Sequence, residues 1–235
     1  MTPHLHDQSV KVVLVEDHEM FREQLAQLIV KEGSFHVCGQ ADNIKSGMDL
    51  IQAQKPDIAV VDISLRGSSG LELVKDLKAQ GLEMPVLILS MHAESLYAER
   101  AIRAGARGYV TKNEVTATLL RAIQRVLDGG IYLSDEMTAS MLGRLSNPGQ
   151  PRQQLGGMEL LTDRELEVFE MLGHGFKTRE IAHQINLGET TVDTYRTRIR
   201  LKLRLRNAAE LYSRAAQWVQ SEGEGMVAAT AAFQN

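Results

Sequence analysis

Four polar side chains in the first half of the chain stand where short apolar runs end. They are Asp17, Asp62, Ser90 and Lys112. The runs are rich in Val, Ile and Leu, which is typical of strands buried in a parallel sheet. A carboxylate at the end of such a strand is costly unless it is paired or used. Because ligands bind at the carboxyl ends of parallel strands, we expect the four residues to share one crevice, with Asp62 as its chemical centre.

The residue types in this crevice suit phosphoryl chemistry. Magnesium prefers hard oxygen ligands, which Asp17 and Asp62 can supply, with Glu16 acting directly or through water. An aspartate is a weak nucleophile, but it can accept a phosphoryl group when a metal ion spreads the charge. Lys112 offers a cation for a phosphoryl oxygen, and Ser90 offers a hydroxyl donor. A single charge at a strand end is more often simply solvated, so the prediction depends on four residues at matched positions.

The elements that must position these residues alternate along residues 10–130. Five apolar runs that predict strands are separated by amphipathic segments that predict helices, and a fifth such segment follows the last run. The predicted strands are 11–15, 36–39, 57–62, 85–90 and 107–110. Alternating strands and helices with right-handed crossovers make an α/β fold, a doubly wound five-stranded parallel sheet covered on both faces.

Composition and length limit the class of protein. The 235 residues are 43% hydrophobic and carry a net charge of −4, which allows two domains with their own cores. The single cysteine, Cys38, argues against a disulfide framework and a cysteine-based zinc site. The first nine residues lack the apolar core of a signal peptide, and no apolar run approaches 18 residues. We therefore expect a cytoplasmic protein with no membrane partner.

The second half of the sequence predicts a small helical domain. Residues 143–159 are rich in Gly, Pro and Gln and indicate a flexible linker. Thr162 and Glu165 then have the spacing of a capping box. Helices are predicted around 166–172, 178–185, 190–204 and 208–220. A tight turn at 186–188 joins the second and third of these, as in a helix-turn-helix.

One stretch within this domain has a conflicting pattern. From Tyr195 to Arg206 neutral or apolar residues alternate strictly with basic ones, and a period of two is typical of a strand. We nevertheless predict a helix, because Arg, Leu and Lys are good helix formers and a capping signal precedes them. The six basic side chains of this stretch, without an acidic one, indicate nucleic-acid binding better than the net charge does.

Two sets of motifs resemble known domains. Residues 10–130 resemble the receiver domain of two-component response regulators, through V-L-V-E-D-H, D-I-A-V-V-D-I-S-L with G-L-E-L, V-L-I-L-S and G-A-R-G-Y-V-T-K. Residues 158–222 resemble the DNA-binding domain of the NarL/LuxR (FixJ) type, through L-T-D-R-E-L-E-V, K-T-R-E-I-A and T-T-V-D-T-Y-R-T-R-I-R-L-K-L. The resemblance implies a flavodoxin-like receiver joined by a linker to a small all-α helix-turn-helix domain.

The receiver resemblance implies a role for each crevice residue. Asp62 would be phosphorylated by a sensor histidine kinase. The ligands of Mg²⁺ would be Glu16, Asp17, Asp62 and the Ser64 carbonyl. Ser90 and Lys112 would grip the phosphoryl group. Tyr109 would be the aromatic switch residue, although a packed strand aromatic is an equally good interpretation of that position.

Two positions depart from the receiver pattern. Arg66 stands where a proline is usual in the loop after Asp62, which bears on the rigidity of the loop and not on the acceptor. Asn113 follows Lys112, so the cis-proline often found there is absent.

The resemblance of the second domain implies a set of DNA contacts. The helix that opens at Thr190 would enter the major groove with its N-terminal part facing the bases. Candidates for base edges are Thr191, Asp193, Thr194 and Thr197. Candidates for phosphates are Arg196, Arg198, Arg200 and Lys202. Lys177 and Thr178 would pin the preceding helix to the DNA backbone. Relatives often carry a lysine where Asp193 stands, and a carboxylate can accept from cytosine, so we predict an altered base preference.

These inferences predict a phosphorylation-controlled transcriptional regulator rather than an enzyme. It would bind double-stranded promoter DNA as a homodimer through the helix 208–220. The expected divisions are a disordered N-terminus 1–9, a receiver 10–132, a linker 133–157, a DNA-binding domain 158–222 and a flexible tail 223–235. Two alternatives stay open: a phosphatase or other Mg²⁺-dependent hydrolase, and a receiver that signals through protein contacts alone with a vestigial DNA-binding domain.

Overall fold

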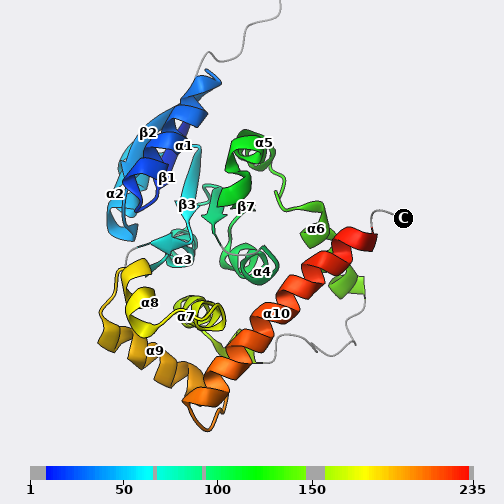
Figure 1. Ribbon diagram of the computed structural model, residues 1–235. Coiled ribbons are helices and arrows are strands. Elements are labelled where there is room, and N and C mark those ends of the chain that lie inside the picture. Colours follow the sequence, from blue (N-terminus) through cyan, green and yellow to red (C-terminus); the bar gives the residue numbers. More distant parts are fainter. Residues whose placement is uncertain (1–8, 66–67, 92–93, 147–156, 233–235) are drawn as a thin grey trace, which may run out of the picture. The chain divides into compact units, whose positions relative to one another are not determined.

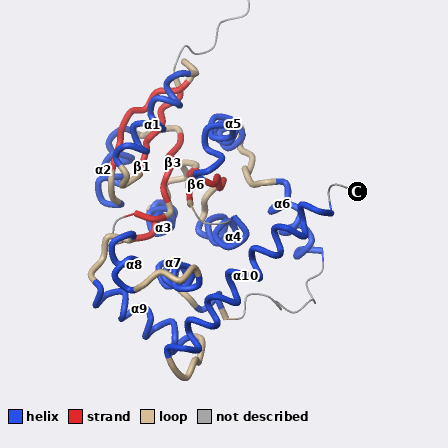
Figure 2. Tube along the Cα trace, in the orientation of Figure 1, coloured by secondary structure: helices blue, strands red, loops and turns tan. Residues whose placement is uncertain are grey.

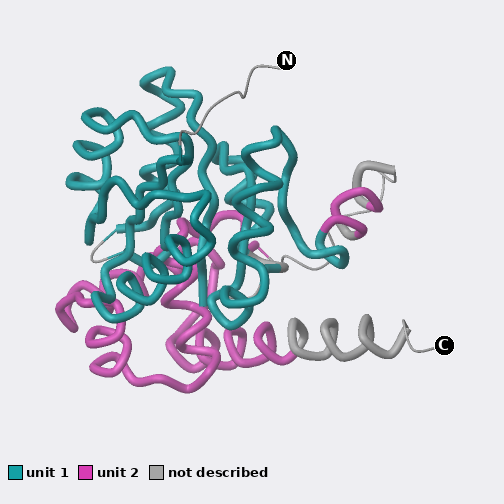
Figure 3. The backbone as a smooth tube through the Cα atoms, turned by 90° about the horizontal axis from the view of Figure 1, so that it is seen from above, with its two compact units in different colours: residues 1–137 teal, residues 138–235 magenta. Residues whose placement is uncertain are grey.

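The computed structural model of the chain describes residues 9–65, 68–91, 94–146 and 157–232. The chain divides into two compact units, Met1–Met137 and Thr138–Asn235, which are coloured separately in Figure 3. The expected disordered segment 1–9 lies, apart from its last residue, outside the described residues. Each unit is considered by itself below.

The first unit is built on a five-stranded parallel sheet. Its order is β2-β1-β3-β6-β7, and every pairing between neighbours is parallel. The strands are β1 (Val10–Val15), β2 (Phe35–Ala41), β3 (Ile58–Asp62), β6 (Val86–Ser90) and β7 (Gly108–Thr111). β2 lies on one side of β1, and β3, β6 and β7 follow on the other, so the strand order reverses at β1. In sheets of this kind ligands bind at the carboxyl ends of the strands beside such a reversal.

Five helices cover the two faces of this sheet, as Figures 1 and 2 show. They are α1 (Glu19–Lys31), α2 (Ile44–Gln54), α3 (Gly70–Ala79), α4 (Glu94–Ala104) and α5 (Val115–Leu127). Leu25 and Ile29 of α1 share one buried cluster with Leu119 and Ile123 of α5 and with alternate residues of the central strands. Helices α1 and α5 therefore pack on one face of the sheet. Right-handed crossovers put α2, α3 and α4 on the other.

The predicted strands and helices of this unit are confirmed, and one local element is new. After Asp62 the chain forms a small antiparallel pair, β4 (Ser64–Leu65) with β5 (Ser68–Ser69). The Ser69 hydroxyl then accepts a hydrogen bond from the Leu71 amide at 3.3 Å and caps α3. Arg66, the residue that departs from the receiver pattern, lies outside the described residues. The loop that follows the central aspartate is thus held at both ends.

The segment 133–157, expected to be a linker, contains a helix. Helix α6 covers Asp135–Ser146, and the boundary between the two units falls within it. The Ser134 hydroxyl accepts from the Met137 amide at 3.1 Å, and Asp135 and Glu136 occupy the first turn, where acidic side chains favour the helix dipole. These N-terminal signals favour a helix within the segment that we expected to link the two domains. Residues 147–156 lie outside the described residues.

The second unit is helical. After a 3₁₀ turn, η2 (Met158–Leu160), it contains α7 (Asp163–Gly173), α8 (Thr178–Gln184), α9 (Glu189–Lys202) and α10 (Ala208–Ala232). The capping box predicted at Thr162 and Glu165 opens α7. Phe169 and Trp218 are buried against each other, with ring centroids 5.5 Å apart. The sequence 226–232 is mostly Ala, the best helix former, so the helix extends into the segment 223–235 that we expected to be a tail.

The stretch with alternating basic residues is helical, as predicted. Val192 and Ile199 are buried and lie seven residues apart, which places both on one side of α9. The helix ends at Lys202, within the stretch, and Arg204 follows with a φ of 55°, a left-handed conformation common just after helices. Among the described residues, no helix combines the length and apolar character that crossing a membrane requires.

Candidate functional site

Three buried carboxylates lie together at the carboxyl ends of β1 and β3. Glu16 and Asp17 directly follow β1, and Asp62 is the last residue of β3. Only 1%, 5% and 2% of these residues are exposed, which is rare for acidic side chains. The three residues predicted from strand ends therefore lie close together.

Lys112 supplies a positive charge to this carboxylate cluster. It follows β7, and its Nζ lies 2.7 Å from Glu16 Oε2 and 2.8 Å from Asp62 Oδ2. The ammonium also lies 4.8 Å from the centre of the Phe21 ring, a cation–π distance. The ammonium thus pairs with two of the three buried carboxylates, so the formal charge of the cluster is negative.

The burial and the charges of this cluster change the pKa values of Asp62 and Lys112. Burial raises the pKa of Asp62 to about 7; Lys112 counteracts this, and Glu16 adds to it. For Lys112 burial alone would lower the pKa, but Asp62 and Glu16 outweigh it, so the pKa of the ammonium is raised. Lys112 is therefore firmly charged, whereas ionised Asp62 is under-compensated.

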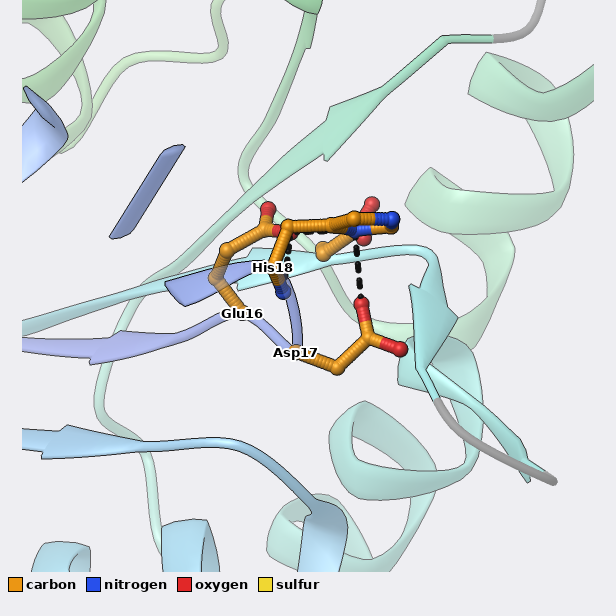
Figure 4. Close-up of side chains that lie close together, drawn as sticks. Glu16, Asp17 and His18 are labelled. Atoms are coloured by element: carbon orange, nitrogen blue, oxygen red, sulfur yellow. Dashed lines mark hydrogen bonds and ion pairs between the residues drawn. The ribbon is translucent and has the colours of Figure 1, made fainter. Parts of the chain in front are cut away.

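His18 belongs to the same cluster, and the sequence analysis did not select it. Its Nδ1 lies 2.9 Å from Asp17 Oδ1 and 3.1 Å from Glu16 Oε1 (Figure 4). The His18 amide also donates to Glu16 Oε1 at 3.1 Å. The imidazole is largely exposed, with 65% of the side chain accessible. Its position directly after an acidic pair was the only available signal.

The donor set fits a hard divalent cation. Ligand atoms of Glu16, Asp17, His18 and Asp62 all lie within 4.8 Å of one another. The residues Glu16, Asp17 and Asp62 are almost fully buried. Buried carboxylates are costly unless a positive charge compensates them, and carboxylate oxygens are the ligands that Mg²⁺ takes. The residues present therefore suit Mg²⁺.

The other residues expected at this site lie on the neighbouring strands. Asp62 pairs with Leu89 across β3 and β6, so Ser90, the next residue, ends β6 beside it and is fully buried. Ser64 follows Asp62 by two residues in β4 and is partly buried. Tyr109 lies in β7 with 1% of its surface exposed. Every described peptide bond is trans, including those around Asn113.

In the second unit, the predicted DNA contacts differ in their exposure. Those on the exposed surface of α9 are Thr190, Thr191, Asp193, Thr194, Thr197 and Arg198. Lys177 is exposed and directly precedes α8, and Thr178 is the first residue of that helix. Arg200 is half-buried. Arg196 and Lys202 have partners within the unit.

Lys202 makes an ion pair that ties α9 to α7. Its Nζ lies 2.5 Å from Glu165 Oε2, and the Glu165 side chain is only 3% exposed. The same carboxylate oxygen accepts from the Thr162 amide at 2.7 Å. Burial opposes ionisation, but the bonds from Lys202 and Thr162 outweigh it and hold the pKa of Glu165 below its usual value. Lys202 therefore has a structural partner, which the expectation of a phosphate contact did not include.

Comparison with known families agrees with both units. The family described as response regulator receiver domain matches residues 12–124. The family described as bacterial regulatory proteins, luxR family, matches residues 159–215. The two matches follow each other in the order of the two units.

Whole-length relatives match across both units. A putative transcriptional regulator of Pseudomonas aeruginosa is 35% identical over 201 residues, covering 86% of this chain and 94% of that protein. The virulence factors putative positive transcription regulator BvgA of Bordetella pertussis is 32% identical with the same coverage. The DNA-binding transcriptional activator DevR/DosR of Mycobacterium tuberculosis is 32% identical over 218 residues, covering 92% of this chain and 99% of that protein.

Solved structures give the same result. A LuxR-family two-component response regulator from Aurantimonas is 30% identical with a TM-score of 0.55, covering 59% of this chain and 99% of that one. RcsB of Salmonella enterica bound to promoter DNA has a TM-score of 0.56 over 89% of this chain and 99% of that one, and at 18% identity it shows the fold alone. With a receiver match, a luxR-family match and relatives that span nearly the whole chain, this protein belongs to the response regulators that join a receiver domain to a LuxR-type DNA-binding domain.

Proposed function

We propose that Asp62 accepts a phosphoryl group from a sensor histidine kinase and that this controls binding of promoter DNA. The observation that supports the acceptor role is the position of Asp62, which is buried at the end of β3 among the carboxylates of Glu16 and Asp17, with Lys112 Nζ 2.8 Å from its Oδ2. A carboxylate beside a metal-binding acidic group and a fixed cation has the partners that phosphoryl transfer needs. Glu16, Asp17, Asp62 and the Ser64 carbonyl would hold Mg²⁺, which would neutralise charge on the phosphoryl oxygens.

The chain's own residues would perform the transfer as follows. A carboxylate oxygen of Asp62 forms the bond to phosphorus while the bond to the donor breaks, and the donor group leaves on the opposite side. The Lys112 ammonium and the Ser90 hydroxyl would then hold the phosphoryl oxygens. To do so, Lys112 must loosen its pairs with Glu16 and Asp62. Through the β7 residues, Tyr109 included, this rearrangement would shift an existing equilibrium between two conformations of the receiver.

Labelling with a small phosphodonor tests the acceptor. The full-length protein is incubated with acetyl phosphate and Mg²⁺, and the acyl phosphate is detected by its lability in alkali. Asp62→Asn should abolish the label, whereas Asp49→Asn, at an exposed position of α2, should leave it intact. Alkali-labile label that persists at the wild-type level in Asp62→Asn would refute the assignment. Steady release of phosphate from added phosphomonoesters would instead favour a hydrolase, and we expect none.

For the second unit we propose that α9 lies in the major groove and that two copies, which contact each other through α10, bind two half-sites. The exposed side chains support this arrangement: Thr191, Thr194 and Thr197 lie on the accessible part of α9, and Arg198 with Arg200 can reach phosphates. Selection of bound sequences from random DNA, with and without acetyl phosphate, tests it. Paired half-sites enriched more strongly after phosphorylation are expected. Failure to enrich any sequence would favour a regulator that acts through protein contacts alone.

A further inference from the structure

Arg196 contacts three helices of the second unit at once. In α9 itself its Nη1 donates to Asp193 Oδ1 at 2.6 Å, one turn earlier. The same nitrogen donates to Thr178 Oγ1 at 3.0 Å, at the start of α8. The guanidinium carbon lies 5.4 Å from the centre of the Tyr212 ring in α10, a cation–π distance. We refer to Arg196, Asp193, Thr178 and Tyr212 as the arginine cluster.

The exposure of the cluster agrees with a role inside the unit rather than on the DNA. Only 23% of the Arg196 side chain is accessible, against 57% for Asp193. The Arg196 Nε is fully buried. A guanidinium that reads phosphates needs its donors directed outwards, whereas here one donor serves two acceptors and the plane lies near an aromatic ring. Arg198, two residues further, is exposed and does not share this arrangement.

We infer that Arg196 is a positioning residue for DNA recognition, and that Asp193 acts as its counter-ion instead of reading a base. This inference rests on the proposed DNA-binding function. It also gives a physical reason for an acidic residue on a helix that faces phosphates. The negative charge of Asp193 is compensated by Arg196 at 2.6 Å, so its repulsion of the DNA backbone is reduced.

The cluster also orients one predicted backbone contact. A threonine hydroxyl has one proton to donate and two lone pairs that accept. Because Arg196 donates to Thr178 Oγ1, the hydroxyl proton must point away from the guanidinium. Thr178 opens α8, the helix expected to cross the DNA backbone, so its proton is left for a phosphate oxygen. Arg196 thereby prepares a neutral phosphate contact without making a charged one.

The salt dependence of DNA binding separates a positioning residue from a phosphate contact. The probe is a duplex carrying the sequence that the full-length wild-type protein enriches from a random pool. Arg196→Met should weaken binding on the order of tenfold, because it removes a charged hydrogen bond and a cation–π contact. The slope of log Kd against log salt should stay unchanged. Arg198→Met is the matched control and should reduce the slope by about one. A slope reduced equally by Arg196→Met would overturn the inference.

A second pair of variants tests the role of Asp193. If it serves Arg196, Asp193→Asn weakens binding to all sequences alike, and the effect largely disappears in an Arg196→Met background. If it reads a base, Asp193→Asn changes the preference at one base pair whichever residue stands at 196, and the inference fails. Arg196→Lys should not restore wild-type affinity, because a lysine lacks the planar group that reaches the ring and both acceptors.

The fold and the proposed function are checked separately from the cluster. Thermal unfolding followed by Trp218, the only tryptophan, reports on the second unit of each variant. If wild-type protein enriches no DNA, the proposed function fails. The role of the arginine cluster can then still be tested by a double-mutant cycle on the free energy of unfolding of the free protein. The effects of Asp193→Asn and Arg196→Met should be non-additive, and additive effects would overturn the inference.

Discussion

Replacement of Asp62 by Asn should stabilise the metal-free receiver at alkaline pH. Burial raises the pKa of Asp62 to about 7, above its ordinary 3.8. Between these two values the folded protein holds the proton more tightly than the unfolded chain does. The stability of the metal-free protein therefore falls as the pH rises from about 4 to about 7, and the penalty is complete above that window. An asparagine has no proton to lose, so the variant lacks this penalty.

The size of the effect follows from the same pKa values. A difference of one in pKa corresponds to about 1.4 kcal/mol, so the three-unit difference sets a ceiling of about 4 kcal/mol at pH 8. Asparagine also loses the attraction between Asp62 and Lys112, whose Nζ lies 2.8 Å from the carboxylate. Lys112 keeps Glu16 at 2.7 Å as a partner. We therefore expect Asp62→Asn to gain about 1–3 kcal/mol at pH 8 and much less at pH 5.

Calorimetry of the full-length protein in EDTA can measure this gain. Because the only tryptophan, Trp218, is buried in the second unit, its fluorescence identifies that unit's transition, and the other transition belongs to the receiver. Asp49→Asn, at an exposed position of α2, controls for the loss of a surface carboxylate. Saturating Mg²⁺ should stabilise the wild type and reduce the advantage of Asp62→Asn. A variant that is destabilised equally at pH 5 and pH 8 would show that Asp62 carries no charge penalty.

Two further substitutions test the packing around each site. Gly70→Ala would place a Cβ 2.0 Å from the Asp62 carbonyl oxygen. It should therefore destabilise the receiver by about 1–3 kcal/mol and impair phosphorylation. Gly143→Ala is the control: nothing lies within 4 Å of its Cβ, so it should be neutral or stabilising. Lys202→Met leaves the buried Glu165 without its cation. The free energy of unfolding of the second unit, followed by Trp218 fluorescence, should fall by about 1 kcal/mol, and the slope of log Kd against log salt for DNA binding should not change. A smaller salt slope in Lys202→Met would return that residue to the phosphate contacts.

The sequence predicted the receiver site because the geometry of a parallel sheet is general. Strand ends can be recognised from apolar runs, and carboxyl ends of parallel strands meet at one edge. The proximity of Asp62, Glu16 and Lys112 follows from these two rules alone. Resemblance added the roles of Ser64 and Tyr109, which no strand-end rule selects.

Contacts between distant helices could not be predicted in this way. Lys202 and Glu165 are 37 residues apart, and Arg196 and Thr178 are 18 apart. In a linear pattern the basic residues of α9 are equivalent, because each recurs at the same spacing. Only the packing of α7, α8 and α10 around α9 separates those that have partners from those that face solvent. Arg196 and Lys202 were therefore predicted as phosphate contacts together with Arg198.

The ends of helices α6 and α10 show a related limit. Periodicity is a good guide to a helix that packs on a core, but a segment with few core contacts depends on caps and propensity instead. The signals at Ser134 and in the alanines of 226–232 were present in the sequence. At Ser134 the signal was outweighed by the composition of the neighbouring Gly- and Pro-rich stretch.

The receiver site is poised because its charges do not balance. Three carboxylates are buried together, and the Lys112 ammonium pairs with two of them, Glu16 and Asp62. A well-compensated site would gain little from a cation or from a change of partner. Here Lys112 is shared between Glu16 and Asp62 and follows β7 directly, so any group that changes the charge at Asp62 changes the force on that strand's end. If Asp62 accepts a phosphoryl group as proposed, the added negative charge would interact differently with Lys112 in the two conformations of the receiver, and that difference would shift the equilibrium between them.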